Sequence, residues 1–194
     1  MSTAAMVLAT KDRALAGGAS TASIAIYGGL VRTVAHLVGG ADASVDVLPD
    51  DAVLAAARRE VPQQVVEEMA QWVWSSWDEL AADAAVLDQL NEVAPDPFPV
   101  TPPGAVAYRC AAEQLAYREG EPTAAVAYAG AQAEARFLRL YGGRTLDSLH
   151  ELAVADVVLE AARRELAAKE KTRITDWVYE QWEAIDEFAT ESAS

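Results

Sequence analysis

Apolar residues recur every three or four positions along most of the chain, and this spacing predicts amphipathic α-helices rather than strands. Serine or threonine precedes several of these segments, and Gly-Gly pairs follow some of them, as is typical of helix starts and ends. The larger apolar residues that set the spacing are Ile24, Tyr27, Val31, Val34 and Val38 in one segment, and Val66, Val73, Trp77, Leu80, Ala84 and Leu87 in another.

The pattern predicts helices with the following approximate bounds. In the first half they cover residues 3–16, 20–40, a segment from Pro49 that carries Arg-Arg-Glu, and 63–92. In the second half they cover residues 105–118 and 123–141. The next helix starts at Thr145 or Ser148 and is nearly continuous over residues 149–188. The sequence therefore predicts an all-α protein.

The chain contains an internal repeat. Residues 51–84 align without a gap with residues 156–189, and about a third of the aligned positions are identical, including an Ala-Ala-Arg-Arg-Glu run. Residues 94–104 carry five prolines and read as an extended linker. We expect two duplicated four-helix units, residues 1–93 and 105–194, that form one helical bundle about a pseudo-twofold axis.

Composition supports helices and hints at the source. The chain of 194 residues has 42 alanines and only 7% aromatic residues, which suits packed helices better than sheets. The chain has twelve arginines but only three lysines, a ratio typical of a GC-rich bacterial or phage coding sequence.

Features of export and membrane insertion are weak in this sequence. The single cysteine, Cys110, cannot form an internal disulfide, and no basic start precedes the first apolar run as in a secretory signal. The longest apolar stretch, residues 19–40, is interrupted by Arg32, His36 and two Gly pairs. We therefore expect a cytoplasmic protein that does not enter a membrane.

The charge distribution is the strongest unusual feature. The net charge is −15, and between Glu60 and Tyr108 there are nine acids and no lysine or arginine; from Ile174 onward all charged residues are acidic. One interpretation is a solvated surface that keeps an alanine-rich protein soluble. The other is a surface that binds a basic protein, or whose carboxylates imitate the phosphates of DNA for a DNA-binding protein. Direct nucleic-acid binding is disfavoured by the same charge.

The tryptophans are arranged around much of a helix circumference. One stripe of tryptophans and aliphatic residues has the spacing of core packing. The other aromatic residues lie farther around the helix circumference, which indicates an interface between the units, between subunits or with a target protein. No basic residues are expected near these aromatic side chains, and their exposure favours a homodimer. The aromatic and acidic interface candidates are Trp72, Trp74, Trp77, Trp177, Tyr179, Trp182, Glu67, Glu68, Asp176 and Glu180.

The repeated arginine pairs, Arg58–Arg59 and Arg163–Arg164, have two interpretations. They form structural ion pairs with neighbouring acids, or the two pairs face each other across the axis and form an anion pocket.

Signatures of catalysis are missing from the sequence. There are two histidines and no matched Glu-x-x-His motifs, and no Gly-Gly pair is followed by the Lys-Ser/Thr of a phosphate loop. We therefore predict no catalytic, cofactor-binding or metal-binding residue. The favoured function is a non-enzymatic adaptor, inhibitor or assembly factor that binds a basic protein. The alternatives are a small-molecule-binding bundle with a pocket between the halves, and an enzyme with an unrecognised site.

Overall fold

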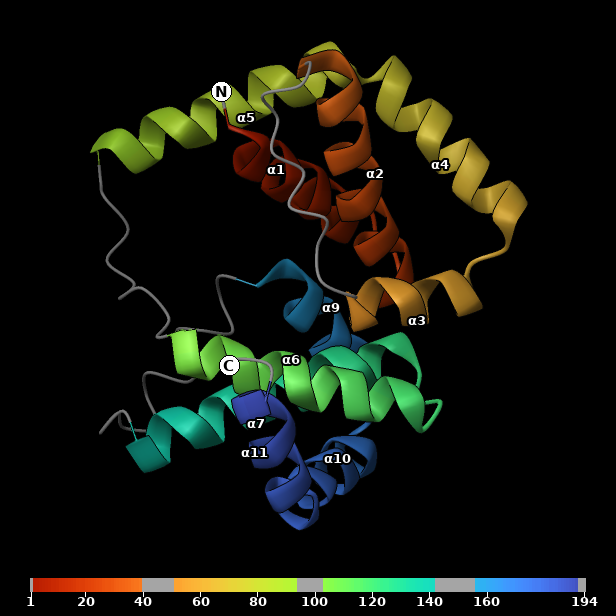
Figure 1. Cartoon of the computed structure of the whole chain (residues 1–194). Helices are drawn as coiled ribbons and strands as arrows, with labels where there is room; N and C mark the ends of the chain where they lie inside the picture. The colour runs from red at the N-terminus through yellow and green to blue at the C-terminus, as the bar shows by residue number, and fades with distance from the viewer. Residues whose placement is uncertain (1, 40–50, 94–102, 142–155, 192–194) are drawn as a thin grey trace. The chain divides into compact units, whose positions relative to one another are not determined.

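The computed structural model describes residues 2–39, 51–93, 103–141 and 156–191. Within these ranges every regular element is an α-helix and there is no strand, which confirms the predicted all-α class (Figure 1). The chain divides into two compact units, Met1–Pro97 and Phe98–Ser194, called unit 1 and unit 2 below.

Each unit contains five helices among its described residues. The helices of unit 1 are α1 (Thr3–Ala16), α2 (Thr21–Gly39), α3 (Ala52–Glu60), α4 (Gln63–Ser75) and α5 (Trp77–Val93). The helices of unit 2 are α6 (Pro103–Arg118), α7 (Thr123–Tyr141), α9 (Val157–Glu165), α10 (Ala168–Glu180) and α11 (Trp182–Glu191).

Short polar side chains and glycines fix several helix ends. The Ser2 hydroxyl accepts a hydrogen bond from the Ala5 amide at 3.1 Å and so caps α1. Asp51 caps α3 in the same way, accepting from the Leu54 amide at 2.9 Å. After α1 and α6 the chain turns at Gly18 and Gly120, whose φ angles of 78° and 84° lie in the left-handed region that glycine adopts without strain.

The predicted single helix over residues 63–92 is wrong, because α4 ends at Ser75 and α5 begins at Trp77. The Ser75 hydroxyl donates to the Trp72 carbonyl at 3.1 Å, which competes with the helical hydrogen-bond pattern. Asp78 and Glu79 then stand in the first turn of α5, where the helix dipole favours acids.

The predicted rod over residues 149–188 is also wrong where the structure describes it. α9 ends at Glu165, and α10 begins at Ala168 because the Glu170 carboxylate accepts a hydrogen bond from the Ala167 amide at 2.9 Å. Residues 149–155 and the two predicted starting residues lie outside the described ranges, as do residues 94–102 of the predicted linker. Pro103, placed in that linker, is the first residue of α6.

In unit 1, helix α2 packs against α1, α3 and α4, while α1 packs against α5 (Figure 1). Polar contacts align α1 with α5 at both ends. Ser2 donates to Asp88 near one end, and Arg13 pairs with Glu79 and Asp83 near the other. The apolar core between these helices includes Met6, Val31, Val34, Val73, Leu80 and Ala84, so the predicted stripe of α4 and α5 is buried at its centre.

In unit 2, helix α7 packs against α6, α9 and α10, and α11 packs against α6. Most buried residues of α7 are alanine, valine or glycine, which allows a close approach to α6. Tyr108 of α6 lies against the rings of Phe137 and Trp182, at 4.6 Å and 5.2 Å between ring centres. Its hydroxyl donates to Asp186, so one aromatic side chain joins α6, α7 and α11.

Helix α2 is apolar and long. Among the described residues it is the one helix that could cross a membrane by length and composition, over Thr21–Val38. Of that window, 44% is buried.

The helix bounds of the two units recur at nearly constant offsets. α9 and α10 begin and end 105 residues after α3 and α4, and α11 begins 105 residues after α5. α2 and α7 both have 19 residues and begin at Thr21 and Thr123, an offset of 102. These offsets relate equivalent positions of the two units.

Candidate functional site

The acidic run predicted in the first half lies on α4 and α5. These two helices carry seven acids and no lysine or arginine. Glu67 and Glu68 are exposed on α4, and each accepts a hydrogen bond from a glutamine one turn earlier, Gln63 and Gln64, at 3.2 and 3.3 Å. Glutamine carries no charge, so these partners do not neutralise the two exposed carboxylates.

Of the three tryptophans on or beside α4, one is mainly exposed. The Trp72 ring meets the Tyr27 ring edge-on at 5.2 Å, and Trp77 packs against the core. Trp74 has 59% of its surface exposed. It follows Glu67 by seven residues, a spacing that places both on one side of α4. We call the exposed side chains of Glu67, Glu68 and Trp74 the acidic-aromatic surface.

Internal contacts balance part of the acidic run farther along. Arg13 of α1 lies 3.1 Å from Glu79 and 3.0 Å from Asp83. The backbone and side-chain hydrogen bonds from Ser2 lower the pKa of Asp88. The acids of α4 have no such basic neighbour among the described residues, so the acidic-aromatic surface keeps its negative charge.

The corresponding surface of unit 2 differs in charge. The predicted interface candidates Asp176 and Glu180 are exposed on α10. The same helix also carries Lys169, Lys171 and Arg173. The acids of the second run lie mainly on α11. An open depression follows α10, lined by Lys169, Thr172, Arg173, Asp176, Trp177 and Glu180. The two units therefore do not present equivalent acidic faces.

The prediction that no basic residues lie near the aromatic side chains is wrong for unit 2. The guanidinium of Arg136 on α7 lies 4.0 Å from the ring centre of Tyr179 and 4.4 Å from that of Trp182. Arg139 also donates to the Tyr179 hydroxyl at 3.1 Å. Nη1 of Arg136 is buried with no hydrogen-bond acceptor among the described residues. The two aromatic rings therefore lie next to this charge and interact favourably with it.

Trp177 has a positioning role in unit 2. Its indole N–H donates to Glu119 at 2.9 Å, and Arg173, one turn earlier on α10, binds both carboxylate oxygens of Glu121 at 2.7 Å. The hydrogen bonds that Arg173 donates to Glu121 are the largest cause that raises the pKa of Arg173. Both contacts hold α10 to the turn between α6 and α7.

The repeated arginine pairs stand in the last turns of α3 and α9, where a positive charge is favoured by the helix dipole. Arg164 pairs with Glu160 one turn earlier at 2.9 Å, as the ion-pair interpretation predicts. Arg58 and Arg59 are exposed, and Arg163 is half-buried. An anion pocket formed by both pairs stays a prediction.

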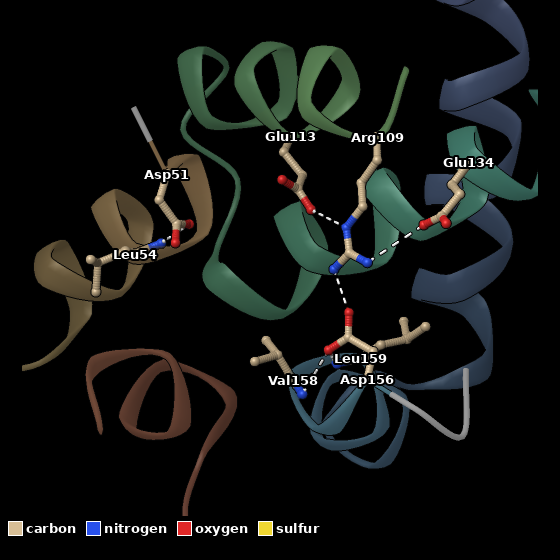
Figure 2. Close-up of polar contacts among 8 residues, drawn as sticks. All are labelled: Asp51, Leu54, Arg109, Glu113, Glu134, Asp156, Val158 and Leu159. Atoms are coloured by element: carbon tan, nitrogen blue, oxygen red, sulfur yellow. Dashed lines mark hydrogen bonds and ion pairs between the residues drawn. The ribbon is translucent and has the colours of Figure 1, made fainter. Parts of the chain in front are cut away.

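Sequence reasoning missed the cluster that holds the two buried acids among the described residues, Glu113 and Glu134, here called the Arg109 centre (Figure 2). Nε of Arg109 lies 2.9 Å from Glu113 on the same helix, and Nη1 lies 3.5 Å from Glu134 on α7. Nη2 pairs with Asp156, which also caps α9. Two signals were available in the sequence: Arg109 and Glu113 are four residues apart, and Glu134 is a charged residue in a segment rich in alanine and glycine.

The electrostatics of the Arg109 centre follow from this geometry. Burial acts to lower the pKa of Arg109, but Glu113 and Asp156 raise it by more. Burial raises the pKa of Glu134, and Arg109 opposes this only in part. The side chains of Glu113 and Glu134 are 11% and 9% exposed, while those of Arg109 and Asp156 are 28% and 19% exposed. The contacts of the centre join α6, α7 and the start of α9.

No metal site is found in the part of the chain that the structure describes. No group of three or more His, Cys, Asp or Glu side chains there is placed to hold an ion. His150 and its neighbour Asp147 lie outside the described residues.

Comparisons with known proteins add no relative: no family model matches the chain, and neither a curated protein nor a solved structure matches it.

Proposed function

We propose that the protein is a non-enzymatic adaptor, inhibitor or assembly factor that binds a basic protein through the acidic-aromatic surface of unit 1. One observation carries the proposal. Trp74 is 59% exposed on α4, a helix whose charged residues, Glu67 and Glu68, are both acidic and exposed.

The chemistry of such a surface suits a cationic protein partner. Uncompensated carboxylates attract a basic surface and accelerate its encounter, and the attraction weakens as salt screens it. An exposed tryptophan contributes a large contact area at small entropic cost, and tryptophan is common among the residues that dominate binding energy. Charge therefore selects the partner, and Trp74 supplies much of the binding energy.

The recurrence of helix bounds at an offset of 105 supports a second proposal about architecture. The two units arose by duplication and pack about a pseudo-twofold axis in a cytoplasmic protein. Their surfaces differ in charge, because α4 of unit 1 carries acids alone while α10 of unit 2 also carries three basic residues.

Affinity purification from the organism that encodes the protein tests the proposed function. The tagged chain is used as bait at about 0.05 M and about 0.5 M salt, which bracket strong and weak screening. A basic protein retained at low salt and released at high salt supports the proposal. A preparation that retains no basic protein at low salt, or retains one equally at both concentrations, overturns it.

A further inference from the structure

In unit 2 an arginine of the chain itself lies over two aromatic rings, one on α10 and one on α11, and Tyr179 keeps 47% of its surface exposed. Arg136 lies over the rings of Tyr179 and Trp182, and Arg139 reaches the hydroxyl of Tyr179 from one turn farther along α7. This arrangement is a filled receptor site for a guanidinium, built from aromatic residues next to the acids of α10 and α11.

The equivalent positions of unit 1 have the aromatic residues but lack the arginines. The offset of 105 relates Tyr179 and Trp182 to Trp74 and Trp77, and the offset of 102 relates Arg136 and Arg139 to Val34 and Leu37. Two contacts support this register. Val34 packs in the same core as Trp77, and Gly28 and Gly130, also 102 apart, each lie under a charged side chain of the preceding helix.

Without those arginines, the Trp74 side chain remains mainly in solvent. Val34 is buried, and its short side chain ends in the core instead of reaching over a ring. Leu37 is 69% exposed near the end of α2, which lies at the same end of unit 1 as the end of α4 (Figure 1). Leu37 and Val38 of α2 and Trp74 of α4 are thus exposed apolar side chains on two helices that pack against each other.

We infer that Trp74 receives an arginine side chain of the basic partner, in the way that Tyr179 and Trp182 receive Arg136 within unit 2. This inference rests on the proposed function and specifies its chemistry. Arginine is favoured over lysine, because its planar guanidinium stacks on aromatic faces and is more weakly hydrated. A second basic residue of the partner meets Glu67, which lies about 10 Å along α4 from Trp74 at a rise of about 1.5 Å per residue.

The direct test is a titration of the full chain with fluorescein-labelled hexa-arginine and hexa-lysine peptides, followed by fluorescence anisotropy at low salt. The wild-type chain is expected to bind hexa-arginine more tightly than hexa-lysine. Trp74→Ala, at an exposed position, is expected to weaken hexa-arginine binding by about 5-fold to 30-fold, which corresponds to one cation–π contact. In this variant the preference for arginine is expected to disappear.

A matched pair of variants separates occupation of the site from loss of charge. Leu37→Arg places an arginine where unit 2 has Arg139, and it is expected to cover Trp74 and weaken hexa-arginine binding. Val86→Arg adds the same charge to α5 at a position that is 55% exposed. It is expected to weaken binding of both peptides alike and to preserve the preference for arginine. Far-UV circular dichroism confirms that each variant is folded.

The outcomes distinguish the two proposals. If both peptides bind in a salt-dependent manner and Trp74→Ala changes neither affinity, the arginine site is overturned and the acidic surface is retained. If Leu37→Arg and Val86→Arg have equal effects on the preference for arginine, the site is also overturned. If neither peptide binds at low salt, the acidic surface itself is not a binding surface for cations.

Discussion

Asp156 uses its two carboxylate oxygens for different purposes: Oδ2 pairs with Arg109, while Oδ1 accepts hydrogen bonds from the amides of Val158 and Leu159. Asp51 repeats this arrangement in unit 1. Its Oδ1 accepts from the Leu54 amide, and its Oδ2 lies 3.8 Å from Arg32 (Figure 2 shows both capping contacts). A capping aspartate thus couples the start of the repeated helix to a basic residue of a neighbouring helix in each unit.

Asp156→Asn tests the energetic importance of this coupling in unit 2. Asparagine preserves a capping oxygen but removes the charge that faces the half-buried Arg109. We expect the free energy of unfolding to fall by about 1–3 kcal/mol, because one partner of a largely buried ion pair is lost while two carboxylates remain. Urea unfolding followed by far-UV circular dichroism measures the change.

Asp51→Asn is the matched control in unit 1. The Arg32 and Asp51 side chains are 37% and 32% exposed and their ion pair is long, so we expect a loss below about 1 kcal/mol. Equal losses in the two variants would show that Arg109 gains nothing from Asp156 beyond the helix cap.

Glu134→Gln is expected to change how stability depends on pH. Burial raises the pKa of Glu134 above its ordinary value of 4.5, so the folded protein holds this proton more tightly than the unfolded chain. The resulting stabilisation is complete below pH 4.5 and is lost as the pH rises through the folded pKa.

The variant lacks this proton equilibrium. The stability of the wild-type chain relative to Glu134→Gln is therefore expected to decrease as the pH rises from 4.5 toward neutrality. Urea unfolding of both proteins over that range measures the difference. A relative stability that increases with pH would mean that Arg109, and not burial, dominates the environment of Glu134.

The two equivalent glycines of the long helices provide a third test. A Cβ at Gly130 would lie 2.5 Å from both Cγ and Oε1 of Glu113, a side chain held by Arg109. Gly130→Ala is therefore expected to destabilise the protein by about 1–3 kcal/mol through overpacking.

At Gly28 the nearest atom is Cε of Lys11, also at 2.5 Å, near the far end of a flexible side chain. Gly28→Ala is expected to be neutral or to stabilise the protein by up to about 1 kcal/mol, because alanine favours a helix more than glycine does. Thermal unfolding of both variants measures the contrast. A larger loss for Gly28→Ala would contradict the assignment of Lys11 as the more yielding neighbour.

The sequence predicted the features that depend on local spacing. The helix class, the approximate bounds of the first two helices and the burial of Val73, Leu80 and Ala84 followed from periodicity and capping residues. The end of α4 at Ser75 was missed because no glycine or proline stands there. The end is set instead by a serine hydroxyl and by acids in the next turn, which are weak signals.

The Arg109 centre and the cover over Tyr179 could not be predicted because their members are distant in sequence. Arg109, Glu134 and Asp156 lie on three elements that meet only when unit 2 folds. Arg136 likewise reaches Tyr179 from another helix, and it is 43 residues earlier in the chain. Helical periodicity places residues on faces, but it does not say which faces meet.

A pair of charge-reversed baits tests the central claim most directly. Glu67→Lys with Glu68→Lys reverses the acidic-aromatic surface of unit 1, and Glu183→Lys with Glu187→Lys makes the same change in net charge at exposed positions of α11. The protein to be followed is the basic protein that the wild-type chain retains at low salt and releases at high salt. The amount of this protein that each bait retains at low salt is compared with the amount that the wild-type chain retains. We expect the first bait to lose it and the second to keep most of it. Equal retention by the two baits would contradict the assignment of the binding surface to α4.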